Sequence, residues 1–103
     1  MRLELARFIE SDLAAIGDYI AADNPRRALS FIQEIREQFA KIGQHPLIFQ
    51  LRPEIGQDVR LAAWGHYVIL FHVVGETVRI ERVAHGSRNL AALFKPESRE
   101  DNA

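Results

Sequence analysis

The stretch HYVILFHVV, His66–Val74, decides the fold that the sequence predicts. Apart from His72, its side chains are apolar on both faces of an extended chain, which is typical of a strand that is covered on both sides. We therefore expect this strand to lie in the centre of a sheet. Two explanations for its second face stay open: aromatic packing against Trp64 and the C-terminal segment, or a partner protein that covers this face or the groove beside the helices.

Alternating polar and apolar residues around this stretch predict three further strands, at Arg2–Ala6, Val59–Trp64 and Thr77–Ala84. Gly65 and the pair Gly75-Glu76 are typical of the turns that join the last three strands. These three strands should therefore pair antiparallel, each with the next.

Between the first two strands, the apolar residues recur at helical spacing. Ser11 suits the N-cap of one helix, and Asn24-Pro25 suits the start of a second helix that ends at Gly43. The connection between them is so short that an antiparallel helical hairpin is expected. Residues 44–57 predict a loop, and Asn89–Phe94 predicts a short C-terminal helix.

The order of elements is therefore β-α-α-β-β-β with a short C-terminal helix. It predicts an α+β fold, an antiparallel sheet of about four strands with the N-terminal helical hairpin packed on one face. A chain of 103 residues suits a single domain. We place that domain at residues 1–94, followed by a polar tail at residues 95–103.

Composition narrows the function classes. The 13 Lys and Arg residues nearly balance the 14 Asp and Glu residues, and the net charge of −1 weighs against nucleic acid as the main substrate. The absence of cysteine excludes disulfides and thiolate metal sites. No apolar run approaches the ~20 residues of a membrane span, and no signal peptide is evident. We expect a cytoplasmic protein without a membrane partner.

The stretch RVAHGSRNL, Arg82–Leu90, contains the best candidates for chemistry, since a histidine stands between two arginines. His85 can act as acid or base, and Arg82 and Arg88 can hold a phosphate. Two other interpretations stay open. The cluster can be a binding surface, or it can be structural, with His85 closing the strand end by hydrogen bonding and Arg82 paired with a carboxylate.

Other histidines and aromatic residues give weaker signals. His66 and His72 are six residues apart on one predicted strand, about 20 Å by strand rise, so we predict no metal site. No cofactor is expected either. Trp64 and Tyr67 flank a turn and can either stack on bases or pack in the core.

Five segments, taken in order and spacing, carry a resemblance to a known family. They are DLAAIGDYIAADNPRRALSFIQEI (Asp12–Ile35), HP (His45-Pro46), RPEIGQDVR (Arg52–Arg60), HYVILFHV (His66–Val73) and VRIERVAHGSRNL (Val78–Leu90). Together they resemble the RelE/ParE superfamily of toxins from type II toxin–antitoxin modules. The resemblance covers about residues 3–94 and is strongest to the ParE branch, also known as plasmid-stabilisation proteins.

The resemblance implies a cognate antitoxin, ParD-like or similar, that wraps the toxin, and operator DNA bound only through the antitoxin complex. The resemblance leaves two possible targets for the toxin, DNA gyrase and mRNA on the ribosome. ParE-like members inhibit DNA gyrase by protein contact, whereas RelE-like members are endoribonucleases that cut mRNA on the ribosome.

Two features favour the gyrase inhibitor, which is not an enzyme. RelE-like members carry lysines at positions that match Ala62 and Trp64, and they often end in a tyrosine where this chain reads LAALF. The alternatives are a ribosome-dependent endoribonuclease that uses Arg60, Arg82, His85 and Arg88, or a non-toxic relative that only binds its antitoxin. The candidate contacts for target or antitoxin are Arg60, Trp64, Tyr67, Arg82, His85, Arg88 and Phe94.

Overall fold

The computed structural model of the chain describes residues 1–94, and the predicted polar tail lies outside the described residues. The elements are, in chain order, β1 (Arg2–Leu5), α1 (Ile9–Ala21), α2 (Pro25–Gln44), the 3-10 helix η1 (Pro46–Ile48), β2 (Gln50–Leu51), β3 (Arg60–Trp64), β4 (Tyr67–Val74), β5 (Thr77–His85) and the 3-10 helix η2 (Leu90–Phe94). Within residues 1–94, neither α-helix combines the length and apolarity that a membrane span requires.

The sheet has the strand order β1-β5-β4-β3-β2, so β4 lies in its centre as predicted. The predicted α+β class and helical hairpin are confirmed, with two differences in the sheet. Strand β2 is a fifth strand, inside the segment predicted as a loop. The sequence does not predict it because two residues are too few to show an alternating pattern. Strand β1 pairs parallel to β5, with Leu3 opposite Val78. Parallel pairing is possible because the helical hairpin and the strands after it form a long connection between β1 and β5.

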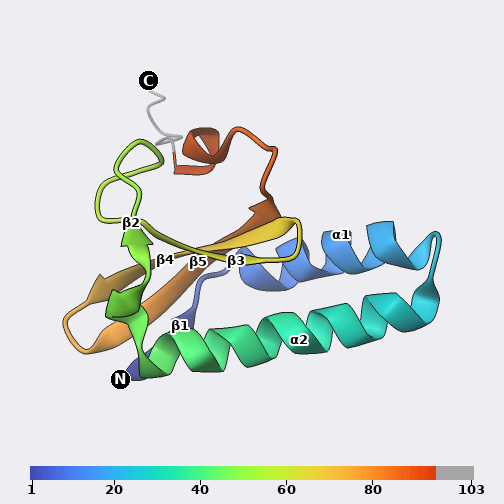
Figure 1. The fold of residues 1–103 in the computed structure, drawn as a ribbon, viewed down its shortest axis with the longest axis horizontal. Coiled ribbons are helices and arrows are strands. Elements are labelled where there is room, and N and C mark those ends of the chain that lie inside the picture. The colour runs from blue at the N-terminus through green and yellow to red at the C-terminus, as the bar shows by residue number, and fades with distance from the viewer. Residues whose placement is uncertain (95–103) are drawn as a thin grey trace.

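The helical hairpin covers one face of the sheet (Figure 1). Residues at helical spacing on α1 and α2 meet alternate residues of the strands in one apolar cluster. Its members are Ile9, Leu13, Ile16, Phe31, Ile35, Phe39, Ile42, Ala62, Ile69, Phe71, Val78, Ile80 and Val83. This cluster holds α1 against β5, where the candidate site lies.

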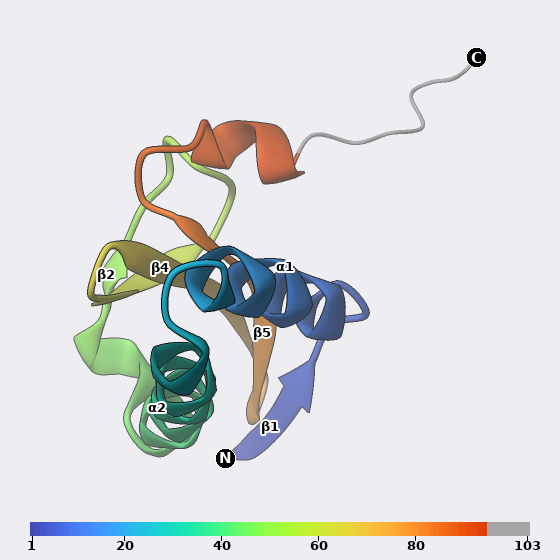
Figure 2. The same ribbon diagram turned by 90° about the vertical axis from the view of Figure 1, so that its right-hand side faces the viewer.

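The opposite face of the sheet has a smaller apolar cluster of Ile55, Val59, Val68 and Leu70. The segment 52–59 and η2 lie side by side over it (Figures 1 and 2), and Leu90, Leu93 and Phe94 pack against it. The expectation that the C-terminal segment covers this face is therefore confirmed. The expectation for Trp64 is wrong, because its side chain packs against the cluster under the helices.

The start of α1 differs from the prediction. The helix begins at Ile9, two residues before the predicted cap Ser11, and the N-cap residue Phe8 makes no capping bond with its side chain. The Ser11 hydroxyl instead donates to the Phe8 carbonyl oxygen at 3.0 Å. Ile9 is fully buried, and tertiary packing of this residue extends the helix without a side-chain cap. The start of α2 is as predicted, since the Asn24 side chain accepts a bond from the Arg27 backbone N–H.

Candidate functional site

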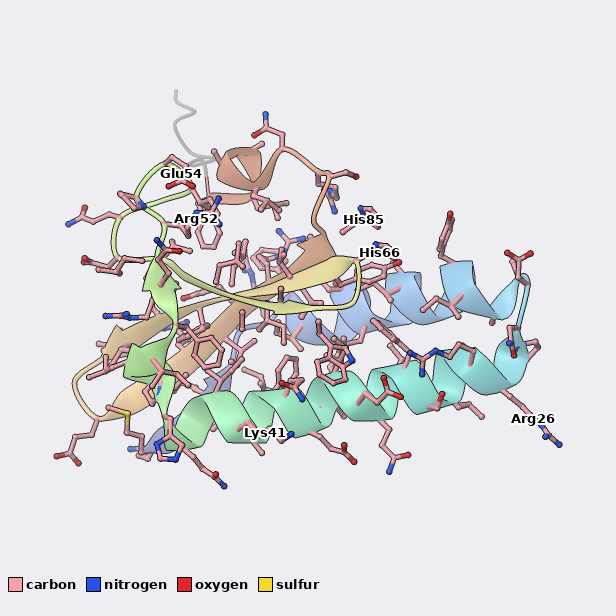
Figure 3. All side chains as sticks on the ribbon, in the orientation of Figure 1. Arg26, Lys41, Arg52, Glu54, His66 and His85 are labelled. Carbon is pink, nitrogen blue, oxygen red and sulfur yellow. The ribbon has the colours of Figure 1, made fainter. Side chains whose placement is uncertain are left out.

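A notch lies between α1 and the end of β5, with a volume of about 510 Å³. Figure 3 shows His85 and His66 close together at this end of the sheet. The Gly86 N–H donates to the His66 carbonyl oxygen at 2.8 Å, which ties the turn before β4 to the turn after β5. The residues that line the notch are Asp12, Ala15, Ile16, Tyr19, Tyr67, Val83, Ala84, His85, Ser87 and Arg88.

An ion pair forms the inner end of this site. The Arg82 guanidinium donates from Nε and Nη2 to the two carboxylate oxygens of Asp12, each at 2.9 Å. Asp12 is only 9% exposed, and its Oδ2 also accepts the Val83 backbone N–H at 3.0 Å. The hydrogen bonds to Asp12 raise the pKa of Arg82. Arg82 is therefore paired with a carboxylate, as in the structural interpretation of this cluster, and that carboxylate lies on α1.

His85 ends β5 and bonds to its own turn. The backbone N–H of Ser87 donates to His85 Nδ1 at 3.1 Å, and the Ser87 hydroxyl lies 2.8 Å from the same nitrogen. Because a backbone N–H can only donate, Nδ1 must carry its lone pair, and the neutral ring carries its proton on Nε2. The side chain thus closes the strand end, as in the structural interpretation of this cluster, and its Nε2–H is left as a donor.

Aromatic side chains hold the His85 ring in place. Tyr67 contacts it edge-on with ring centroids 5.3 Å apart, and His66 stacks on it at 6.1 Å. Tyr67 itself packs against Phe31 of α2 at 5.3 Å. Burial raises the pKa of Tyr67, and the nearby phenol of Tyr19 raises it further. Tyr67 therefore stays protonated at neutral pH and can donate a hydrogen bond.

The other candidate residues lie away from the notch. Arg60 is opposite Phe71 on β4, and its Nη1 donates to the Phe49 carbonyl oxygen at 2.6 Å. Since Tyr67 is opposite His85, Arg60 is displaced along the sheet by four residues, about 13 Å. Trp64 donates from Nε1 to Glu34 Oε1 at 3.1 Å on the helix side.

Phe94 is on the opposite face of the sheet. Its ring contacts His72 edge-on with centroids 5.9 Å apart. Both nitrogens of His72 have partners, Glu81 and the Gln57 carbonyl oxygen, so His72 is a hydrogen-bonded residue of the sheet. Within residues 1–94, histidine, aspartate and glutamate form no group of three suited to a metal ion.

Sequence reasoning missed three polar residues of the notch, Asp12, Tyr19 and Ser87. Asp12 does carry a signal, since it continues the helical spacing of the buried residues Ile9, Leu13 and Ile16. A charged residue on the apolar face of a helix indicates a buried partner. No sequence pattern singles out Tyr19, whose side chain is 75% exposed. It lines the notch only because α1 lies beside β5.

Comparisons with known proteins assign the family. The sequence model of the family described as the ParE toxin of the type II toxin-antitoxin system parDE matches residues 3–90. This chain belongs to the ParE toxin family. The match confirms the resemblance found in the sequence. It covers the helical hairpin and the sheet of this ParE-family chain except for Arg2, the first residue of β1, and it ends at the first residue of η2.

Solved structures agree with this assignment. The chain is 30% identical to a chain of the chromosomal ParDE toxin–antitoxin system from P. aeruginosa, covering 82% of this chain and 95% of that one with a TM-score of 0.70. It shares the fold of a chain from the RelBE2 toxin–antitoxin complex of Mycobacterium tuberculosis at 24% identity, the same coverages and a TM-score of 0.56. A search of curated proteins found no match.

Proposed function

We propose that this ParE-family chain is the toxin of a type II toxin–antitoxin module and inhibits DNA gyrase through protein contact. In this proposal a cognate antitoxin neutralises it. The family match and the two neighbouring toxin–antitoxin structures support the toxin role. The choice of gyrase as the target is supported by the match to the ParE branch and by the hydrogen bonds that Arg82 and Arg60 already make.

The pairing of Arg82 with Asp12 is the main observation against a nuclease. RNA cleavage requires cations that are free to stabilise the developing charge on phosphate. Arg82 donates from two of its nitrogens to a buried carboxylate. Arg60 lies about 13 Å along the sheet from His85 and donates to a backbone carbonyl. Among the four residues of the nuclease alternative, only His85 and Arg88 are left in the notch with donors to offer.

An antitoxin partner is supported by exposed apolar side chains at the β2 edge of the sheet. Leu47 and Ile48 of η1 are 65% and 77% exposed, and Leu51 of β2 is also exposed. Within residues 1–94, strand β2 has a pairing partner on one side only, β3. An exposed strand edge beside apolar side chains suits a partner segment that adds a strand or lays an apolar face on this surface.

A paired assay tests the target. Purified protein is added to a gyrase supercoiling and DNA-cleavage assay, and separately to a translating extract in which mRNA ends are mapped by primer extension. We expect loss of supercoiling with broken DNA, and intact mRNA. Codon-phased mRNA cuts together with normal gyrase activity would contradict the proposal, and the variant His85→Ala should then abolish the cuts.

A further inference from the structure

We propose that the notch between α1 and the end of β5 binds an acidic side chain of a protein partner. The ligand is an aspartate or glutamate next to an apolar residue in a peptide segment. The carboxylate would meet Arg88 and the Nε2–H of His85, while the apolar neighbour would pack on the wall made by α1 and Tyr67. This site differs from the apolar surface at the β2 edge.

Apart from Asp12, every polar side chain that lines the notch can donate a hydrogen bond. The carboxylate of Asp12 lines it, but both oxygens are occupied by Arg82 and the Val83 N–H. Within residues 1–94, no carboxylate forms an ion pair with Arg88. The notch therefore presents one uncompensated positive charge and an imidazole N–H, and both groups can donate to a carboxylate.

The apolar wall is held in place before any ligand arrives. Ile16 is 7% exposed and belongs to the main apolar cluster, and Tyr67 packs against Phe31. Ala15 adds a small exposed surface beside them. Because these side chains are already ordered, binding costs little conformational entropy on the protein side. An aliphatic or aromatic side chain next to the carboxylate would bury this wall.

A peptide fits this site better than RNA. Binding along a nucleic-acid backbone requires a series of cations that follow the phosphates. Here Arg82 is already paired, and among the described residues 1–94 Arg88 is the one arginine or lysine that lines the notch. Asp18, the exposed carboxylate next to Tyr19, lines the groove between α1 and α2 instead. A single cation beside an apolar wall suits a single carboxylate.

The test begins with a random linear peptide library displayed on phage and selected on the whole chain. The best peptide is then compared with its Asp→Asn or Glu→Gln form by fluorescence anisotropy, on the parent protein and on Arg88→Ala. We expect the amide to weaken binding to the parent about tenfold, and to change binding to Arg88→Ala little, because the carboxylate has then lost its partner.

Two variants serve as controls. Arg26→Ala removes another exposed arginine, at the tip of the helical hairpin and away from the notch (Figure 3), and should bind as the parent does. Ala15→Glu adds a carboxylate to the exposed wall and should abolish binding. Circular dichroism verifies that each variant is folded.

The proposal is overturned if no peptide is enriched, if the selected peptides need no carboxylate, or if Arg26→Ala and Arg88→Ala weaken binding equally. It is also overturned if a single-stranded RNA oligonucleotide binds in an Arg88-dependent way and the peptides do not. The assay contains no gyrase, so its result is separate from that of the gyrase proposal.

Discussion

Asp12 is the residue on which the geometry at the end of β5 depends. It joins α1 to the guanidinium of Arg82 and to the Val83 N–H, and it is almost fully buried. Asp12→Ala would leave a largely buried cation and a buried N–H without partners. We expect the free energy of unfolding to fall by about 3–5 kcal/mol, measured by urea denaturation followed by circular dichroism.

Glu10 offers a matched control on the same helix. It also pairs with an arginine, Arg36, at 2.7 Å, but both side chains are exposed to solvent. Exposed ion pairs contribute little to stability, so Glu10→Ala should unfold at nearly the same urea concentration as the parent. An equal loss of stability in Asp12→Ala and Glu10→Ala would contradict the role given to burial.

At the scale of elements, His72 connects three parts of the fold. Its Nδ1 lies 3.0 Å from Glu81 Oε2 on β5, and its Nε2 lies 3.0 Å from the Gln57 carbonyl oxygen in the segment 52–59. Phe94 of η2 packs edge-on against the ring. A carbonyl oxygen and an ionised carboxylate both accept, so the two bonds together require the doubly protonated imidazolium.

The charges around His72 predict how stability depends on pH. The hydrogen bond to Glu81 raises the pKa of His72 in the folded chain, with the Gln57 carbonyl and the charge of Asp58 adding to it. Burial of the ring opposes this rise in the pKa, and Arg79 lies 3.6 Å from the same Glu81 oxygen. Because the folded state holds the proton more tightly, this stabilisation is complete below the unfolded pKa near 6.5. It is lost as the pH rises through the higher folded value.

The measurement is the urea midpoint as a function of pH. We expect the parent to lose stability from about pH 6.5 upward, and His72→Gln to show a flatter profile over that range. NMR titration of the ring should give a pKa above that of a free histidine. His45→Gln, which changes an exposed histidine, should keep the slope of the parent. A parent profile that matches that of His72→Gln would contradict the link between Glu81 and the segment 52–59.

At the scale of the whole molecule, truncations test the predicted domain boundary. Both apolar clusters described are built from residues up to Phe94. A chain of residues 1–94 should therefore keep the stability of the parent. A chain of residues 1–89 lacks the three side chains of η2 that cover the second cluster, and should lose about 3 kcal/mol, at roughly 1 kcal/mol for each partly buried side chain. Thermal unfolding compares the three chains, and a loss already present in 1–94 would show that the boundary is wrong.

The sequence by itself determined the features that depend on local pattern. The helical spacing and the Asn24-Pro25 start predicted α2, and the apolar residues on both faces of β4 predicted its central place. The order of weak motifs was enough to identify the ParE family. These features are readable because each depends on residues close together in the chain.

Only the tertiary structure decided which distant residues meet. Asp12 and Arg82 are 70 residues apart, and no local pattern specifies that pair or the separation of Arg60 from His85. Strand β1 pairs parallel to β5, and the segment 52–59 packs over β4. Both arrangements likewise depend on contacts that form only when the sheet assembles. In the local sequence, RVAHGSRNL is the end of a strand and the turn after it. In the fold it is also one side of the notch, because α1 supplies the Asp12 carboxylate and the apolar wall on the other side.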